Sequence, residues 1–246
     1  MLGPYGSDST RAVAKARARA EAVVWNHGAA ADDVQRLPGV VSVSSPAGRY
    51  LVAAARGLAE LRPGAAVALV TAPGRFARFA REGLEREAHS LALELVDDPA
   101  EADAVLACGP LRFELELFRG LVGSGALLGG VSPGLAAFPG LLGANPEGML
   151  APVQWHPDLR VNPELGPPSV ELEDYVAAQA YAAALIAQRC LELAPGDPLA
   201  AARPLRTRTF FGDFELDPAT GLQCGHRLAV VQWRRGRRAL VLAAAA

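Results

Sequence analysis

The sequence predicts an α/β fold in which parallel sheets are flanked by helices. Short apolar runs alternate with helical stretches from residue 22 to residue 155, and strands that alternate with helices at this spacing pair in parallel. Residues 156–170 interrupt the pattern because they are rich in proline, so we expect an irregular surface segment there. The C-terminal part holds the turn sequences DPATG and RRGRR between strand-like runs, which predict an antiparallel hairpin added to the parallel fold.

The individual elements follow from local patterns. A polar turn of Gly, Pro, Ser and Asp precedes an Ala- and Arg-rich run without a breaker, which is typical of a helix start. Helices are expected at residues 10–22, 47–64, 75–90, 111–125 and 173–196, two of which stop at Pro-Gly. Apolar runs that end in loops predict strands within residues 22–28, 39–46, 65–74, 91–98, 102–110, 126–134 and 148–155.

Composition excludes several classes of protein. Hydrophobic side chains make up 51% of the 246 residues, which excludes global disorder and suffices for one large core or two smaller ones. A net charge of −2 provides no field that would attract nucleic acid, so no nucleic-acid partner is expected. The uncharged segment 120–146 contains Pro133, Pro139 and several glycines, so we expect a strand and a loop there, and no membrane-spanning helix.

The sequence contains no recognisable catalytic or metal-binding motif. Cys108, Cys190 and Cys224 are widely spaced, without a metal-ligand or disulfide pattern, and we expect them to be buried small side chains. The turns around Cys108 (CGP) and Ser132 (VSPG) are the nearest approach to a nucleophile turn, and each has a simpler explanation as a loop. We therefore predict that the chain is not an enzyme and has no metal or cofactor, and catalysis is the least favoured alternative.

Six segments in a fixed order carry a resemblance to a known family. They are LGPYGSDST, WNHGAAADD, VSVSSPAGRY, LGANPEGML, YAAALIAQ and GDFELDPATGLQCGHRLAVVQW. No segment is specific by itself, but together they span nearly all of the chain in the correct order. The chain resembles the type I periplasmic binding proteins, specifically the leucine/isoleucine/valine-binding proteins of ABC uptake systems.

The resemblance implies a two-lobed type I periplasmic-binding-protein-like fold with a C-terminal antiparallel hairpin. Residues 1–45 and 156–205 correspond to the first lobe, and residues 46–155 and 206–246 to the second. Crossings near Ser45, Trp155 and Leu205 would form the hinge. Family members have another strand–helix–strand portion before the Ser loop, so the expectation is a first lobe that lacks its N-terminal part. A misassigned start codon, a gene remnant and a shortened variant are equally compatible with this.

The resemblance also implies a small ligand held in a cleft between the lobes. Helix N-terminal N–H groups suit a carboxylate, and Ser7, just before the first helix, could donate its hydroxyl or serve only as an N-cap. The ligand-binding residues that the resemblance implies are Tyr5, Ser7, Trp25, Asn26, Gly28, Ala29, Ala30, Phe76, Ser132 and Tyr175.

The chain departs from the pattern of the amino-acid binders at several positions. It has Ala30 and Ala31 where the family usually carries a Thr, and Val131 and Ser132 where the second lobe usually presents an acidic residue. Phe76 stands where a Tyr is usual. Each lost charge-assisted hydrogen bond weakens recognition by about 1.5–3 kcal/mol, so the ligand need not be an ordinary amino acid.

Several residues have structural alternatives to a binding role. Trp25 and His27 stand at a strand end, where Trp25 could stack on a ligand and His27 donate to it, or Trp25 could pack in the interior and His27 lie at the surface. Tyr175 could contact the ligand or face the core. Asp32 and Asp33 most simply cap a following helical turn. Trp155 and His156 stand at the second crossing, where a structural role is expected and a hinge-lining role is the alternative. His226 on a terminal strand is by itself no evidence of catalysis.

The predicted function is that of a ligand-binding subunit of a branched-chain-amino-acid-type ABC uptake system, with an ABC permease as partner. Its expected ligand is a small polar metabolite or an amino-acid-like or amide-like molecule. The alternatives are an intracellular ligand sensor and a non-binding remnant or interaction module, which would pair as a homodimer through the incomplete first lobe. Relatives are periplasmic or extracellular. This chain shows no signal peptide at its N-terminus, which would make it cytoplasmic if the start is genuine.

Overall fold

The computed structural model describes residues 1–17, 22–167 and 170–243. The chain divides into two compact units, each built from two separate parts of the sequence. Unit 1 consists of Met1–Pro46 and Gln154–Arg227, and unit 2 of Ala47–Val153 and Leu228–Ala246.

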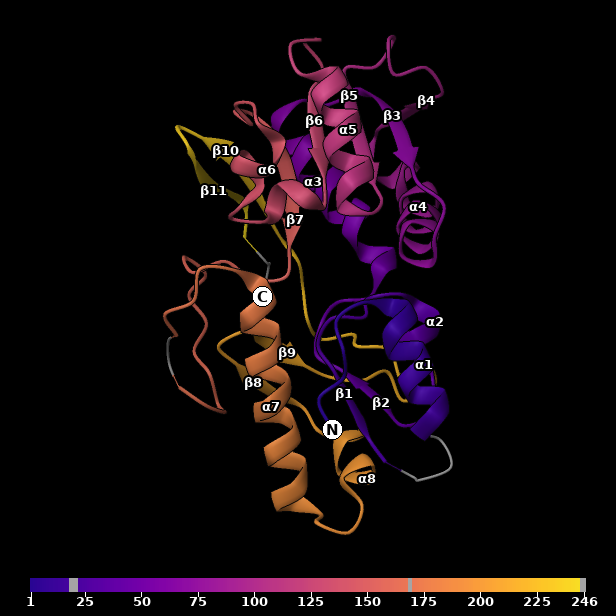
Figure 1. Cartoon of the computed structure of the whole chain (residues 1–246), viewed down its shortest axis with the longest axis vertical. Helices are drawn as coiled ribbons and strands as arrows, with labels where there is room; N and C mark the ends of the chain where they lie inside the picture. The colour runs from indigo at the N-terminus through magenta and orange to yellow at the C-terminus, as the bar shows by residue number, and fades with distance from the viewer. Residues whose placement is uncertain (18–21, 168–169, 244–246) are drawn as a thin grey trace. The chain divides into compact units, whose positions relative to one another are not determined.

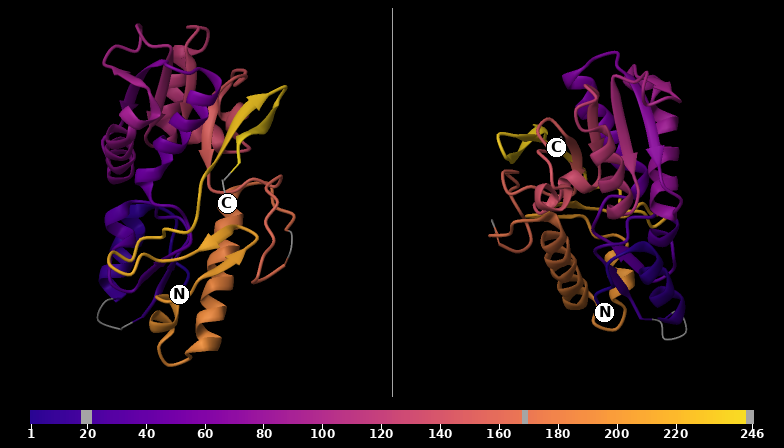
Figure 2. Two further views of the ribbon diagram at one scale, coloured as in Figure 1. Left: turned by 180° about the vertical axis from the view of Figure 1, so that it is seen from behind. Right: turned by 45° about the horizontal axis from the view of Figure 1, so that its top comes forward.

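Unit 2 is built on a seven-stranded sheet with the order β11-β10-β7-β6-β5-β3-β4. Neighbouring strands among β3 to β7 pair in parallel, whereas β10 runs antiparallel to both β7 and β11 (Figures 1 and 2). The strand bounds are β3 (Ala66–Thr71), β4 (Glu94–Val96), β5 (Ala104–Cys108), β6 (Leu127–Gly130), β7 (Leu150–Val153), β10 (Ala229–Arg234) and β11 (Arg237–Leu242). The predicted parallel sheet and C-terminal antiparallel hairpin are confirmed. Arg235 (φ 54°) and Gly236 (φ 75°) form the hairpin turn, which requires positive φ at both central residues.

Helices cover both faces of this sheet, α5 on the face nearer the viewer in Figure 1 and α3 behind it. The α5 face packs through Leu115 and Phe118 of α5 and Phe138 of α6 against alternate strand residues such as Val105 and Ala107. This alternation is expected of strands, whose successive side chains point to opposite faces. The bounds are η2 (Ala47–Arg49), α3 (Tyr50–Leu61), α4 (Arg75–Glu87), η3 (His89–Leu91), α5 (Leu111–Leu121), η4 (Ser132–Gly134) and α6 (Phe138–Leu142).

Unit 1 contains a parallel pair of short strands and an antiparallel pair. Its elements are α1 (Ser7–Arg17), β1 (Val24–Asn26), α2 (Asp32–Gln35), β2 (Val40–Ser42), α7 (Tyr175–Leu193), α8 (Pro198–Ala202), β8 (Thr207–Thr209) and β9 (Gly212–Phe214). The first residues of the chain extend the parallel pair, because Leu2 forms a parallel bridge with Trp25, whose N–H donates to Met1 O at 2.9 Å. Ala14 of α1 packs against Val24 of β1 and Val40 of β2.

The third division between the units follows Arg227, not Leu205 as the sequence predicted. Residues after Leu205 remain in unit 1 because their side chains pack there: the Phe210 ring contacts the rings of Trp155 and Tyr181. The Gln223 side chain also donates to Val43 O at 3.3 Å. The other two divisions follow Pro46 and Val153. That the units are lobes hinged at these crossings stays a prediction.

Most predicted helices and strands are present. The first helix begins at Ser7, earlier than predicted, because Gly6 O already accepts the N–H of Thr10; residues 18–21 of the prediction lie outside the described residues. In DPATG, the Asp217 carboxylate accepts the N–H groups of Ala219 and Thr220, which confirms the turn. Segment 120–146 contains β6, η4 and α6. Among the described helices, none has both the length and the apolar character needed to cross a bilayer.

Candidate functional site

Three predicted site residues of unit 1, Tyr5, Ser7 and Gly28, lie close together at the amino end of α1. The N–H of Gly6 donates to Gly28 O at 3.1 Å, and the N–H of Ala31 donates to Ser7 Oγ at 3.2 Å. Gly28 packs so closely on Tyr5 that a Cβ at this position would lie 2.5 Å from Tyr5 Cδ2. The polar turn before α1 and the loop after β1 therefore lie side by side.

Asn26 shapes the loop that follows β1. Its side-chain amide donates to Ala29 O and to Ser42 Oγ, both at 2.7 Å, and its Oδ1 accepts the N–H groups of Gly28 and Ala29. Two donors and two acceptor positions are all that an Asn side chain offers. Asn26 therefore has no remaining hydrogen-bonding capacity for a ligand, and its part in the site is to hold the loop.

Hydrogen-bonding capacity remains at Ser7 and at Ala30. Ser7 Oγ accepts from Ala31, so its own proton is still available to an acceptor. Within the described residues, no hydrogen bond involves the backbone N–H or C=O of Ala30, which is 7% exposed. Ala29 is fully buried, and its backbone groups are used by Asn26. The first N–H groups of α1 have no partner within the helix and carry partial positive charge.

Tyr5 lies near Tyr175 and Gln179 of α7, beside this loop. Tyr5 is 54% exposed, but partial burial of its hydroxyl raises the pKa of Tyr5 above its ordinary value, so the phenol is neutral. Tyr175 is buried at the start of α7, where the Asp174 carboxylate accepts its N–H. The sequence did not indicate that Tyr175 lies near Tyr5.

His27 contributes an acceptor atom next to Tyr5. Its Nε2 lies 3.0 Å from Gly3 O, so Nε2 carries the proton, and partial burial lowers the pKa of the ring. The Nδ1 atom is buried without a hydrogen-bond partner among the described residues. Trp25, by contrast, is 5% exposed, on a strand bonded on both sides. Its indole is part of the packed interior of unit 1.

Unit 2 carries the other two predicted site residues. Phe76 lies in the first turn of α4, where its ring packs edge-on against Tyr50 with the centroids 4.9 Å apart. A hollow of about 550 Å³ lies at the carboxyl end of β3, lined by Thr71, Ala72, Pro73, Gly74, Arg75, Arg78 and Arg81. Ser132 is buried at the carboxyl end of β6, where its N–H donates to Glu114 Oε2 at 2.7 Å.

Glu114 is a residue that the sequence analysis missed. Its carboxylate is fully buried and also accepts the N–H of Gly109 at 3.1 Å. Burial raises its pKa to about 7, against the opposing effect of its hydrogen bonds. The detectable signal was a Glu on the apolar face of a helix, at helical spacing from Leu111 and Phe118.

A second missed group is a buried polar cluster in unit 1. The Ser45 hydroxyl lies 2.8 Å from His226 Nδ1 and donates to His226 O, and the Ser45 N–H donates to Gln154 Oε1 at 3.0 Å. The His226 ring stacks on Phe211, with 4.5 Å between centroids. These residues border the three chain divisions, so the cluster ties the crossing segments together on the side of unit 1.

Catalysis was the least favoured alternative, and its two candidate nucleophiles, Cys108 and Ser132, are both in unreactive surroundings. Cys108 is fully buried, and burial together with the Glu114 charge raises the pKa of its thiol well above the ordinary value, so the reactive thiolate is suppressed. The Ser132 hydroxyl hydrogen-bonds to Glu114, a carboxylate that burial favours in its protonated form. Within the part of the chain that the structure describes, no three His, Cys, Asp or Glu side chains form a metal-binding group.

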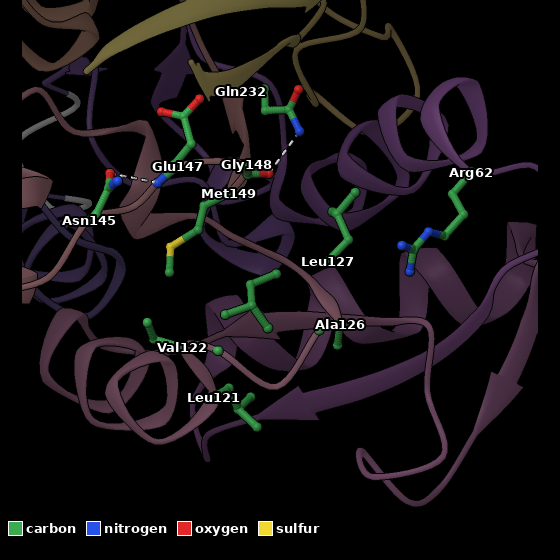
Figure 3. Close-up of a pocket in the computed structure, with 13 residues that line it drawn as sticks. Arg62, Leu121, Val122, Ala126, Leu127, Asn145, Glu147, Gly148, Met149 and Gln232 are labelled. Carbon is green, nitrogen blue, oxygen red and sulfur yellow. Dashed lines mark hydrogen bonds between the residues drawn. The ribbon is translucent and has the colours of Figure 1, made fainter. Parts of the chain in front are cut away.

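A separate groove of about 190 Å³ lies in unit 2 (Figure 3). Its wall includes Leu121, Val122 and Met149, with Arg62 at the opposite end from Asn145 in Figure 3. Most of its polar groups are used internally: Gln232 donates to Gly148 O, and Asn145 accepts the N–H of Glu147. None of the predicted site residues lines this groove.

Comparison by sequence finds no similar protein: no family model and no curated protein matches the chain. Comparison of structures finds many. A solute-binding protein of an ABC transporter from Rhodopseudomonas palustris, in complex with p-hydroxybenzoic acid, is similar with a TM-score of 0.74 and 17% identity, over 99% of this chain and 76% of that one.

Two proteins of the leucine-binding type are equally similar. The leucine-binding protein LivK from Thermotoga maritima matches with a TM-score of 0.76 and 14% identity, over 97% of this chain and 77% of that one. LivJ from Streptococcus pneumoniae, in complex with isoleucine, matches with a TM-score of 0.73 and 12% identity, over the same shares of the two chains. The chain therefore has the type I periplasmic-binding-protein fold of these ABC-transporter solute-binding proteins.

Proposed function

We propose that the chain is a solute-binding protein of an ABC uptake system, and that it captures a small organic carboxylate. The observation that carries the proposal is the convergence of Ser7, the amino end of α1 and the loop 28–31, where donors are grouped around the unused backbone of Ala30. A carboxylate matches this group because its oxygens only accept hydrogen bonds.

The chemistry of the donors supports an anionic group at this place. The amino end of a helix favours a negative charge, and a hydrogen bond to a charged group contributes about 1.5–3 kcal/mol. The Ser7 proton and the Ala30 N–H both remain available.

The ligands of the similar proteins support the same class. Two of them are complexes with p-hydroxybenzoic acid and with isoleucine, and both of these ligands carry a carboxylate. Ala30, Ala31 and Val131 offer no side-chain group to an ammonium ion. An aromatic or aliphatic acid is therefore the first candidate, and an amino acid the second.

The proposal includes Phe76 and Ser132 of unit 2 among the ligand-binding residues. A conformational change on binding would couple ligand capture to an ABC permease, because a ligand stabilises the state that it contacts best. The protein would then act outside the cytoplasmic membrane, as a binding protein and not as an enzyme.

A ligand panel tests the proposal. Thermal unfolding is followed with p-hydroxybenzoate, 3,4-dihydroxybenzoate, leucine and isoleucine. A ligand at 100 times its Kd adds about 2.7 kcal/mol, which raises the Tm of a chain of this size by about 5–10 °C. No shift with any small carboxylate would contradict the proposal.

A matched pair of variants tests the site. Ser7→Ala removes the proton donor and should weaken binding of the responding ligand by about 10- to 150-fold, the loss of one charge-assisted hydrogen bond. Ser9→Ala changes an exposed serine of the same helix and should leave the Kd unchanged. Equal Kd values in both variants would place the ligand elsewhere.

A further inference from the structure

Glu114 holds two loops of unit 2 with one buried carboxylate. Its Oε1 accepts the N–H of Gly109 at 3.1 Å and its Oε2 accepts the N–H of Ser132 at 2.7 Å. The hydroxyl of Ser132 also hydrogen-bonds to it. The carboxylate therefore has three donors around it, which stabilise its charged form.

These donors stand at the carboxyl ends of two neighbouring parallel strands. Gly109 directly follows β5, and Val131 directly follows β6. The backbone of β6 approaches closely, since a Cβ at Gly130 would lie 2.9 Å from Glu114 Oε2. The carboxyl ends of parallel strands are where open α/β sheets bind ligands. Glu114 thus joins the two loops at the edge of the sheet where Ser132 stands.

No cation in the described part of the chain neutralises this carboxylate. Among the described residues, no Arg, Lys or His forms an ion pair with Glu114, and the titratable group that faces it is the Cys108 thiol at the end of β5. On its own helix, Glu116 is exposed and paired with Arg112. The charge is therefore held by N–H and O–H donors alone, and burial raises the pKa of Glu114 to about 7.

We propose that Glu114 is the positioning residue of the ligand-binding edge of unit 2, whose ionised carboxylate fixes the loops 109–110 and 131–132 and directs the Ser132 hydroxyl. When Glu114 is protonated, its new O–H needs a hydrogen-bond acceptor, but the groups around the carboxyl are N–H and O–H donors. Ser132 Oγ is the one such group that can accept it, so its hydrogen bond to Glu114 reverses and the Ser132 proton turns elsewhere. The role in ligand binding rests on the proposed function, whereas the loop arrangement does not.

A backbone amide titration without ligand tests the inference. Amide chemical shifts of Gly109, Val131 and Ser132 are followed by NMR between pH 5 and pH 9. We expect the three amides to titrate together with one midpoint near pH 7 in the unchanged protein. Glu114→Gln should abolish this titration, and Glu116→Gln, on the exposed side of the same helix, should leave it unchanged.

Two results would overturn the inference. One is a flat response of the three amides through pH 6–8 in the unchanged protein, and the other is the same titration in Glu114→Gln. If Glu114→Gln does not fold, the same titration is measured in Glu114→Asp, whose carboxylate still titrates on a side chain one methylene shorter. We expect the titration midpoint of the three amides to change in this variant. An unchanged midpoint in that variant would also overturn the inference.

A second readout connects the loops to binding. The Kd of p-hydroxybenzoate is measured between pH 6 and pH 8 in the unchanged protein and in both Gln variants. We expect a pH dependence that Glu114→Gln loses and Glu116→Gln keeps. Absence of binding by every protein would count against the proposed function, while the amide titration would still stand.

Discussion

Glu114 makes the free energy of unfolding depend on pH. Its pKa is about 7 in the folded protein, above the ordinary value of 4.5, so the folded state binds the proton more tightly than the unfolded state. The stability from this group is therefore full below pH 4.5 and is lost as the pH rises through 7, a difference of about 3 kcal/mol. Urea unfolding at pH 5 and pH 8 should show this loss in the unchanged protein and not in Glu114→Gln.

Asn26 is the residue on which the loop after β1 depends. Asn26→Ala removes four hydrogen bonds and leaves buried partners such as the Ala29 N–H without an acceptor, so we expect a loss of about 2–4 kcal/mol in stability. Asn145 is an exposed turn residue with one such bond, and Asn145→Ala should cost less than about 1 kcal/mol. Chemical denaturation of both variants measures the difference. Equal losses would mean that Asn26 does not hold the loop.

The sequence could predict Ser7 and Gly28 as candidate site residues, but it could not predict the structural roles of Asn26 and Glu114. Ser7 and Gly28 both lie next to local signals, a turn before a helix and a loop after a strand. The Asn26 side chain hydrogen-bonds to Ser42, sixteen positions away. The Glu114 carboxylate hydrogen-bonds to Ser132, eighteen positions away. Contacts over such distances follow from strand pairing, which local patterns do not specify.

At the scale of elements, two helical glycines should respond in opposite directions to the same change. Gly83 of α4 is buried, and a Cβ there would overlap the carbonyl oxygen of Gly48, so Gly83→Ala should destabilise by about 1–3 kcal/mol. Gly120 of α5 has open space around it, so Gly120→Ala should stabilise by about 0.5–1 kcal/mol. Urea unfolding decides, and a stabilised Gly83→Ala would contradict the packing of α4 on η2.

The long elements were predictable, and the short ones were not. The β3 to β7 strands and α3, α4, α5 and α7 follow from periodicity and from Pro or Gly at their ends. The five-residue helices α6 and α8 were not foreseen, and the strand-like run predicted before DPATG was not divided into the three-residue strands β8 and β9. These elements are too short to show a hydrophobic periodicity in the sequence. They are stabilised by tertiary contacts, such as the packing of the Phe210 ring against Trp155.

At the scale of the molecule, self-association through unit 1 stays a prediction. Met1, Leu2 and Tyr5 are 47%, 48% and 54% exposed, and Leu2 lies at an edge of the parallel strands. Exposed apolar residues at a strand edge favour pairing with another chain. Light scattering should give twice the chain mass of 25.6 kDa, and Leu2→Ser should lower it, whereas Leu191→Ser on α7 should not. A monomer at all concentrations would contradict this.

The central claim is that a small carboxylate binds at the amino end of α1 beside the loop 28–31. Its most direct test is an amide chemical-shift map with and without the responding ligand of the panel. The account predicts the largest shifts at Ser7 and Ala30, together with Tyr5 and Gly28 beside them. Shifts confined to another surface, such as Val122 and Met149 of the groove in Figure 3, would contradict it.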